Sequence, residues 1–432
     1  MIPARATVTS GPISSDPYTN ATSQHDTEVE PDTLSVGSTV VAAFQAGRFF
    51  DGGASNIGWA TSTNGGSTWV HGFLPSTTVF AAPPGPYDRV SDPSVAYDRV
   101  HHVWLISSLA LTAAPSVRSP AILVSSSSDA KTWNAPVAVA TTPTGDYDKN
   151  WIVCDQGTDV HSGNCYLTWD DYGRVNRLLS STSSDGGRTW GTPRATVGNA
   201  RGIGGQPLVE PDGTIVVPFS TNQDIYVYRS TNGGKSWSAP TPVAVTEHHS
   251  VAGKIRESVL PSAEIAADGT IYVAWPDCRF RTGCASNDIV YTSSSDRALT
   301  WTPARRVPID DPTSTVDHFF PGVGVDQGSS GSSKRLAVLY YFYPKTNCTA
   351  STCRLGVGII KSADGGVTWS APIVLSSGML LSWLARTTQG PMVGDYFSVS
   401  WSRGHPVPVY VVAKSPVTPN VLNEAATSAS GV

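Results

Sequence analysis

A short motif that returns six times along the chain limits the folds open to this sequence more than any other feature. The pattern is Ser-x-Asp-x-Gly-x-Thr-Trp, and its copies occupy residues 62–69, 127–133, 183–190, 230–237, 294–301 and 362–369. Two copies are degenerate, because the one at 127–133 is a residue short and the one at 294–301 has Ala298 in place of glycine. A motif that recurs every 47 to 68 residues is typical of a repeat architecture.

The motif is interpreted as a structural turn. An Asp or Asn can cap its own turn with a side-chain hydrogen bond, and the glycine supplies a positive φ. We expect the tryptophan to pack between neighbouring repeats. The spacing matches a four-stranded blade with its loops, so the sequence predicts an all-β propeller of antiparallel blades.

The strand pattern supports this interpretation. In the fifth repeat, we expect strands at 258–267, 270–275 and 288–292, with the turn Asp268-Gly269 between the first two. The fourth repeat has the same pattern at 207–210 and 214–219. No long helical periodicity is present.

The number of blades is less constrained than the fold. After the last motif, two strand-like runs remain at 396–401 and 407–413, and another lies at 6–10. Together they favour seven blades, with residues 1–26 closing the last blade and residues 27–432 forming one propeller domain. Six blades with extra terminal strands is the alternative.

Composition narrows the possible partners. Charged residues make up 15% of the chain, against roughly 25% in soluble domains, and the net charge is −5. The chain has no Lys/Arg-rich run of the kind that binds nucleic acid, and no apolar stretch is long enough to span a membrane. We expect a monomer.

The six cysteines form three local pairs, namely Cys154 with Cys165, Cys278 with Cys284, and Cys348 with Cys353. None has the spacing of a zinc site, and proximity favours these three disulfides among the fifteen formal pairings. Disulfides indicate an oxidising compartment, so we expect the protein to be secreted.

The repeated motif resembles the Asp-box of the sialidase superfamily, also called BNR-repeat proteins, and the resemblance covers nearly the whole chain. It implies a propeller fold strongly and a function weakly, because such propellers include sialidases, other glycosidases, polysaccharide lyases and non-enzymes. Sialidases use a Tyr nucleophile assisted by a Glu, an Asp as general acid and base, and arginines that hold the substrate carboxylate.

Three segments are similar to parts of that site. The first is Gly47-Arg48-Phe49-Phe50-Asp51, where the resemblance implies that Asp51 is the general acid and base and that Arg48 binds the substrate. The run from Glu257 to Arg279 implies an assisting Glu and a substrate-binding Arg, and Gly394-Asp395-Tyr396 implies Tyr396 as nucleophile. The family's N-terminal arginine element is absent, since residues 25–31 are acidic, and no convincing third arginine is present.

Independently of the family, charged residues collect where the inner strands are expected to begin. The positions that we expect to contact substrate there, besides Arg48 and Arg279, are Arg89, Asp148, Trp151, Arg256 and His318. Such a ring would gather carboxylates and guanidiniums in one concave place around the axis.

These observations lead to three hypotheses. The first is an exo-acting, retaining glycoside hydrolase that acts on a glycan with an acidic sugar. The second is a polysaccharide lyase in which His318 and Tyr396 act beside a uronate carboxylate. The third is a non-catalytic glycan-binding propeller. The sequence predicts no cofactor, and the pairs Asp170-Asp171 and Asp310-Asp311 are interpreted as solvated turns in preference to calcium sites.

Overall fold

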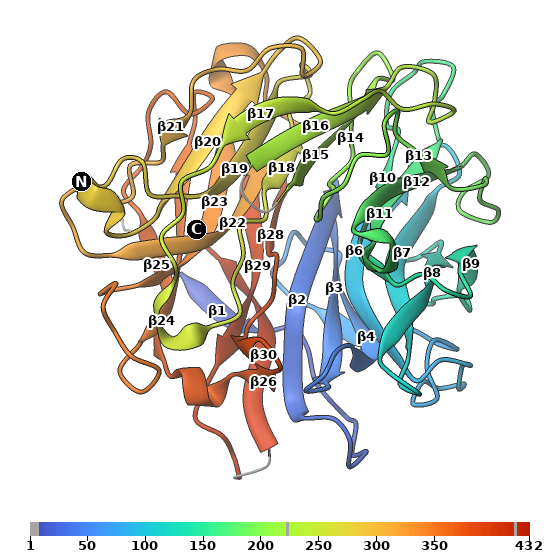
Figure 1. The fold of residues 1–432 in the computed structure, drawn as a ribbon, viewed down its shortest axis with the longest axis horizontal. Helices are drawn as coiled ribbons and strands as arrows, with labels where there is room; N and C mark the ends of the chain where they lie inside the picture. The colour runs from blue at the N-terminus through green and yellow to red at the C-terminus, as the bar shows by residue number, and fades with distance from the viewer. Residues whose placement is uncertain (1–7, 222–223, 419–420) are drawn as a thin grey trace.

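The computed structural model describes residues 8–221, 224–418 and 421–432. Within these ranges the chain consists of strands and short 3-10 turns (Figure 1), which confirms the all-β prediction. The turns are η1 (Tyr172–Arg174), η2 (Ala252–Lys254), η3 (Thr282–Cys284), η4 (Gly331–Ser333) and η5 (Leu381–Trp383).

The strands pair as successive antiparallel four-stranded units, each made from four consecutive strands. The first three units are β2 (His25–Val36), β3 (Thr39–Arg48), β4 (Ala54–Ser62) and β5 (Val70–Phe73); β6 (Arg89–Asp98), β7 (Val103–Thr112), β8 (Arg118–Ser127) and β9 (Val137–Thr141); and β10 (Tyr147–Cys154), β11 (Cys165–Asp171), β12 (Arg177–Ser183) and β13 (Arg194–Ala195).

The next three units are β14 (Leu208–Val209), β15 (Ile215–Ser220), β16 (Asp224–Ser230) and β17 (Thr241–Val245); β18 (Ser262–Ile265), β19 (Ile271–Asp277), β20 (Asp288–Ser294) and β21 (Arg305–Arg306); and β22 (Asp317–Val325), β23 (Leu336–Tyr343), β24 (Leu355–Ser362) and β25 (Ile373–Met379). A separate small hairpin joins β26 (Ala385–Thr387) to β27 (Gly390–Met392). Neighbouring units pack face to face as the blades of a propeller.

Both ends of the described chain meet in a further unit, whose order is β28 (Ser398–Ser402), β29 (His405–Ala413), β30 (Val421–Ser430) and β1 (Thr9–Pro12). Its inner strand β28 lies against β2, and the Oγ of Ser398 in β28 donates a hydrogen bond to the carbonyl of Thr33 in β2 at 3.1 Å. The terminal strand expected at 6–10 falls partly outside the described residues, and the strand present is Thr9–Pro12. The unit fits the seven-bladed interpretation, and the blade count stays a prediction.

The repeated motifs form the turns between the third and fourth strands of a unit. In the last copy, Gly366 N–H donates to Ser362 Oγ at 2.8 Å, and Thr368 N–H donates to Asp364 Oδ1 at 2.8 Å. Trp369 lies 5.8 Å from the ring of Tyr291 in the preceding unit, whose hydroxyl donates to the carbonyl of Gly366 at 2.7 Å. The tryptophan therefore packs between neighbouring blades, as the motif predicted.

The degenerate motif at 294–301 shows how much of this turn geometry depends on glycine. Ala298 adopts a left-handed φ of 59°, and its N–H still donates to Ser294 Oγ at 3.0 Å. At the equivalent Gly366, whose φ is 91°, a Cβ would lie 2.6 Å from the Tyr291 hydroxyl. The turn itself tolerates alanine at a cost, whereas the close approach of the preceding blade requires glycine.

Candidate functional site

The inner strands of four units are bent at the same place. Register shifts interrupt the pairing of β2, β6, β10 and β22, between Val29 and Asp32, Ser91 and Ser94, Asp148 and Trp151, and Phe319 and Gly322. Within each shift one residue has a left-handed φ of about 50°, and these residues are Glu30, Asp92, Lys149 and Phe320. Such bulges re-aim side chains, and they are common beside active sites.

Three of the four bulge residues meet in a cluster of charges at the axis of the propeller. The Nζ of Lys149 lies 3.4 Å from Glu30, 3.1 Å from Asp92 and 2.6 Å from Asp395. Asp395 also accepts a pair of hydrogen bonds from Arg256. We call these five residues the axial cluster, and they come from five separate segments of the chain.

The axial cluster is buried, and burial separates the protonation of its carboxyls. Burial raises the pKa of Glu30 to about 8, although Lys149 opposes that effect. Burial would also raise the pKa of Asp395, but Arg256 and Lys149 hold it well below its usual range. The pKa values of these two neighbouring carboxyls are thus shifted in opposite directions, which is the pattern found where acid–base chemistry takes place.

Tyr396 lies beside this cluster. Its ring stands edge-on to Trp151 with centroids 5.0 Å apart, and the Lys149 ammonium lies 5.7 Å from the ring centroid. The phenol is buried and donates to the carbonyl of Pro93 at 3.1 Å. Burial, with Glu30 and Asp92 nearby, raises the pKa of Tyr396 well above its ordinary value.

Arg48, Asp51 and Arg89 lie at the edge of the first two units. Arg89 Nη1 pairs with Asp51 at 2.5 Å and stacks over Phe49, while the Asp51 side chain stays 51% exposed. Burial would raise the pKa of Asp51, but Arg89 lowers it below the ordinary value. Arg48 is buried and donates to the carbonyl of Gly53 at 2.6 Å, and its Nε has no hydrogen-bond partner.

Glu257 has a different partner from the one that the family resemblance implies. Its Oε1 lies 3.1 Å from Nε2 of His248, whereas the hydroxyl of Tyr396 is bonded to Pro93. Burial would lower the pKa of His248, but its bond to Glu257 raises it above the ordinary value. The two side chains line a hollow of about 410 Å³ together with Ser250 and Ser258.

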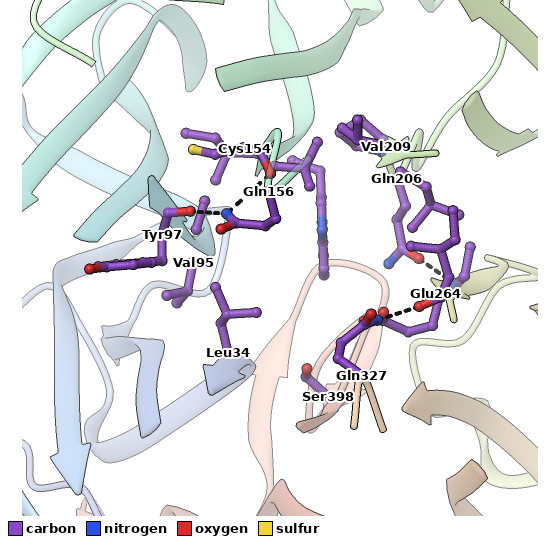
Figure 2. A pocket seen from close by; sticks show the side chains of 18 of the residues that line it. Leu34, Val95, Tyr97, Cys154, Gln156, Gln206, Val209, Glu264, Gln327 and Ser398 are labelled. Carbon is purple, nitrogen blue, oxygen red and sulfur yellow. Dashed lines mark hydrogen bonds between the residues drawn. The ribbon is translucent and has the colours of Figure 1, made fainter. Parts of the chain in front are cut away.

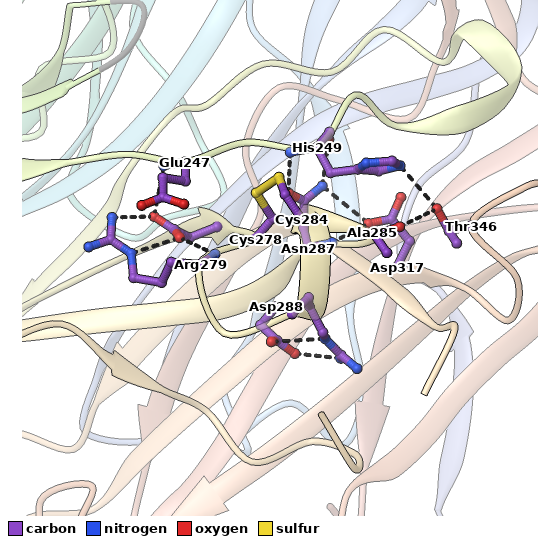
Figure 3. Close-up of a disulfide and its surroundings, with 12 residues drawn as sticks. Glu247, His249, Cys278, Arg279, Cys284, Ala285, Asn287, Asp288, Asp317 and Thr346 are labelled. Carbon is purple, nitrogen blue, oxygen red and sulfur yellow. Dashed lines mark hydrogen bonds and ion pairs between the residues drawn. A yellow bond between two sulfur atoms is a disulfide. The ribbon is translucent and has the colours of Figure 1, made fainter. Parts of the chain in front are cut away.

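Arg279 is held beside a disulfide (Figure 3). Its Nε and Nη2 form a two-point contact with Asp277 at 2.8 and 2.7 Å. The Cys278–Cys284 bond closes the loop that carries Arg279. Cys154–Cys165 and Cys348–Cys353 are also present, so the predicted pairing is confirmed. Arg279 is therefore already paired with a carboxylate of the protein.

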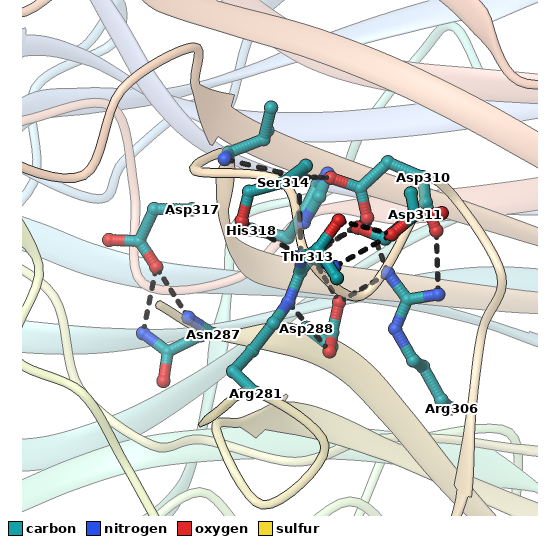
Figure 4. Close-up of polar contacts among 11 residues, drawn as sticks. Arg281, Asn287, Asp288, Arg306, Asp310, Asp311, Thr313, Ser314, Asp317 and His318 are labelled. Carbon is teal, nitrogen blue, oxygen red and sulfur yellow. Dashed lines mark hydrogen bonds and ion pairs between the residues drawn. The ribbon is translucent and has the colours of Figure 1, made fainter. Parts of the chain in front are cut away.

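His318 lies in a second charged network, between the fifth and sixth units (Figure 4). Arg281 binds Asp288 and Asp310, and Arg306 binds the same two carboxylates. The His318 side chain is 2% exposed, and burial lowers its pKa to about 4. Three of these residues could ligate a metal, but the two arginines already neutralise both carboxylates.

The two acidic pairs differ from each other. Asp311 is exposed, as expected for a solvated turn, whereas Asp170-Asp171 is buried inside β11, so the turn interpretation is wrong for that pair. Asp170 pairs in register with the half-buried Asp148, and neither oxygen of Asp170 has a hydrogen-bond partner. Burial and the neighbouring Asp148 raise the pKa of Asp170 well above its ordinary value.

The structure thus brings together some of the predicted site residues and separates others. Arg256 and Trp151 lie at the axis with Tyr396, whereas Asp51, Glu257, Arg279 and His318 each have other partners. Glu30, Asp92 and Lys149 are among the charged residues that the sequence places at the starts of the inner strands, although they were not among the expected substrate contacts. Glu30 and Asp92 each precede a proline, and that local signal marks both bulges in the sequence.

Comparisons with known proteins agree with this fold. A family model described as a BNR repeat-like domain matches residues 166–378. No curated protein matches the chain by sequence. In the part of the chain that the structure describes, no helix has the length and apolar character needed to cross a membrane.

Several solved structures have a similar fold. A protein of unknown function from Dyadobacter fermentans DSM 18053 has a TM-score of 0.52 and 15% identity, over 82% of this chain and 99% of that one. An ulvan lyase, solved with a GlcA–Rha3S ligand, has a TM-score of 0.52 and 11% identity, over 94% of both chains. The NanB sialidase from Streptococcus pneumoniae has a TM-score of 0.46 and 12% identity, over 97% of this chain and 70% of that one.

The two matches with a TM-score of 0.52 show a shared fold at low identity, so the activity has to be argued from the site itself. The family model spans units three to six, and the motifs outside it at 62–69 and 127–133 extend the same repeat toward the N-terminus. Residues 166–378 therefore match the BNR repeat-like domain that is typical of sialidase-like propellers.

Proposed function

We propose that this protein is a secreted, exo-acting glycoside hydrolase of the sialidase type, with Tyr396 as its nucleophile. The observation that carries the proposal is the position of Tyr396 at the axis, between Trp151 and Lys149 and beside Glu30 and Asp395, whose pKa values are shifted in opposite directions. Secretion is supported by the three disulfides, which persist in oxidising compartments.

The reaction is a double displacement. The Tyr396 oxygen attacks the anomeric carbon while the bond to the leaving group breaks, and Asp51 gives its proton to the leaving oxygen. Water then cleaves the glycosyl–tyrosine bond, with Asp51 acting as base. Lys149 would stabilise the phenolate that forms, because an ammonium near a developing negative charge lowers its free energy.

Two contacts have to change before this step. The Tyr396 phenol must leave the carbonyl of Pro93, and Asp51 must leave Arg89 to become protonated. Glu257 can accept the Tyr396 proton only after it releases His248. Substrate binding is the event that would exchange these contacts, since catalytic hydrogen bonds often tighten only in the complex.

The arginines constrain the sugar. Arg89, Arg256 and Arg279 each hold a carboxylate of the protein. Arg48 has no ion pair with a carboxylate among the described residues, and its buried Nε has no hydrogen-bond partner. We therefore propose that Arg48 holds the acidic group of the sugar, with Asp148 and Trp151 on the remaining face.

The test is hydrolysis of a panel of fluorogenic glycosides that includes an α-sialoside, with wild type and Tyr396→Phe compared. We expect the variant to lose at least about 10³-fold in kcat/KM, because the nucleophile is removed. Tyr291→Phe is the matched control, since it deletes another buried phenol that donates to a backbone carbonyl, far from the axis. Full activity in Tyr396→Phe, or no cleavage of any glycoside by the wild type, would contradict the proposal.

A second function, cleavage of an acidic polysaccharide by β-elimination, is favoured by one observation. His248 and Glu257 form a hydrogen-bonded pair in a hollow of about 410 Å³, and a lyase needs such a base beside a uronate. His248 takes this role in place of the buried His318. Because its pKa is raised, the unprotonated base would appear only above the ordinary histidine range.

The products separate the two functions. A lyase yields an unsaturated sugar that absorbs in the ultraviolet, and His248→Asn would abolish that signal while Tyr396→Phe would remove glycoside hydrolysis. Incubation with uronate-containing polysaccharides that gives no ultraviolet signal at any pH from 6 to 9 would exclude the lyase reaction on those substrates.

A further inference from the structure

A second cavity opens at the far end of the inner strands, away from the axial cluster (Figure 2). It has a volume of about 350 Å³, and segments of β2, β6, β10, β14, β18, β22 and β28 line it. Much of its wall is apolar, and the apolar side chains include Leu34, Val95, Ile152, Leu208, Ile265 and Val323. The Trp151 side chain, which touches Tyr396 from the other end, also lines this cavity.

Three carboxyl groups line the cavity, and they come from three different units. They are Asp32, Glu210 and Glu264, and the described lining contains no Lys, Arg or His. Asp32 accepts a hydrogen bond from the N–H of Val95 at 2.8 Å. Glu210 is 4% exposed, and its Oε1 has no hydrogen-bond partner. Uncompensated carboxyls in an apolar wall are unfavourable unless a ligand supplies the missing partner.

Amides complete the polar part of the wall. Figure 2 shows Gln156 across the opening from Glu264 and Gln327. Gln156 and Gln327 each donate to backbone carbonyls of the strands, and Gln206 accepts from the N–H of Ala263 at 2.6 Å. One end of each amide is therefore held by the backbone, and the carboxyls are the groups of the lining that can carry a negative charge.

We infer that this cavity binds an organic ammonium ion with a hydrocarbon body. The ammonium group would lie between Glu264 and Glu210, and the hydrocarbon would lie along the apolar wall against the Trp151 ring. Burial of the hydrocarbon against the apolar wall and the Trp151 ring would stabilise the complex by roughly 25 cal/mol per Å² of apolar surface. The cavity excludes anions, because three carboxyls and no cation face it.

Protonation links binding to pH. Burial, with Asp32 nearby, raises the pKa of Glu264 to about 8, and burial raises the pKa of Asp32 to about 6. Burial raises the pKa of Glu210 to about 7, with Asp212 adding to the effect and Arg297 opposing it. Tyr97 is the other titratable group of the lining. An ammonium ion needs the ionised carboxyls, so its affinity should rise between pH 5 and pH 9.

The test uses three ligands that share one hydrocarbon chain, namely hexylammonium, hexan-1-ol and hexanoate. Their affinities for the full chain are measured by calorimetric titration at pH 5, 7 and 9. We expect hexylammonium to bind at least about tenfold more tightly than hexan-1-ol at pH 9, since a charge-assisted contact distinguishes them. Hexanoate should not bind at pH 9, where both it and the carboxyls of the cavity are ionised, and the preference for hexylammonium should disappear at pH 5.

Two variants assign the site. Glu264→Gln keeps the shape and removes the charge, so hexylammonium should weaken about tenfold while hexan-1-ol is unchanged. Gln156→Trp fills the mouth from an exposed position and should weaken both ligands. Glu247→Gln is the control, because Glu247 is exposed and lies outside this cavity.

Equal affinity for hexylammonium and hexan-1-ol in the wild type, or an unchanged hexylammonium affinity in Glu264→Gln, would overturn the inference. Glycoside hydrolysis is measured on the same variants, so that a failure of this site is distinguishable from a failure of the proposed function.

Discussion

The two ends of the propeller axis handle buried charge in opposite ways. At the end where the inner strands begin, Lys149 and Arg256 compensate Glu30, Asp92 and Asp395. At the other end, Asp32, Glu210 and Glu264 face one cavity without a cation among the lining residues that the structure describes. Trp151 lies between the two ends and contributes to both.

This difference teaches what each end can do. The axial cluster connects segments from five parts of the ring, so its charges hold blades together as well as offering acid–base groups. The carboxyls of the cavity hold few such contacts, and burial leaves them partly protonated at neutral pH. The buried ion pairs of the axial cluster stabilise the fold only while both partners are present. The carboxyls of the cavity have no cationic partner, so they are available to bind a ligand.

The sharpest way to break the comparison is to remove the cation at the centre of the axial cluster. Lys149→Met should lower the free energy of unfolding at pH 7 by about 3–5 kcal/mol, because it leaves buried carboxylates without their ammonium partner. Denaturant unfolding monitored by tryptophan fluorescence measures it. The deficit should shrink as the pH falls, since protonation of those carboxyls removes the uncompensated charge.

The matched control is Lys334→Met on the surface. Lys334 Nζ lies 2.9 Å from Asp268, and the two side chains are 14% and 32% exposed. Removal of this pair should change the free energy of unfolding by about 1 kcal/mol or less. Similar losses in both variants would show that the axial cluster contributes no more than a surface pair, and the contrast between the two ends would then fail.

The sequence predicted the fold well because the repeat depends on local chemistry. The turn at 362–369, its tryptophan and the three short disulfide loops are each specified within a few residues, and these features are present as expected. Strand bounds were less accurate. The inner strand expected at 258–267 is Ser262–Ile265, because the residues before it form the loop that carries Glu257.

The site was predicted in part, because its contacts join segments that are far apart in the sequence. The sequence singled out Arg256 and Tyr396 correctly as neighbours of the axis, since both lie just before an inner strand. It could not predict that Glu257 would bond to His248, or that Lys149 would bond to Glu30 across 119 positions. The Lys149–Glu30 pairing follows from the bulges at both residues, and the Glu257–His248 pairing follows from the long connection between β17 and β18.

At the cavity end we expect a smaller effect, which is the contribution of Glu264 to the pH dependence of the free energy of unfolding. A carboxyl whose pKa is raised in the folded state stabilises the fold below its unfolded pKa, and that stability is lost as the pH rises through the folded pKa. For Glu264 the loss should fall between about pH 4.5 and pH 8. Glu264→Gln should reduce this decline by about 1–2 kcal/mol, as measured by urea unfolding across that range.

Glu247→Gln should leave the decline unchanged, because that side chain is exposed. A pH profile of Glu264→Gln that coincides with the wild type would mean that Glu264 is ionised in the folded state at all these pH values, and the cavity would then hold a compensating cation already.

The smallest effect on stability is expected at the rim, where a charge pair of the first end meets solvent. Asp51→Asn breaks a pair whose carboxylate is 51% exposed, so the free energy of unfolding should change by less than about 1 kcal/mol. If Asp51 is the general acid, the same variant should lose about 10²–10⁴-fold in glycoside hydrolysis. Arg89→Lys keeps a positive charge beside Asp51 and should keep most of the activity. A variant that is as active as the wild type would reduce Asp51 to a surface ion pair and leave the acid to be found within the axial cluster, where Glu30 is the carboxyl with the raised pKa.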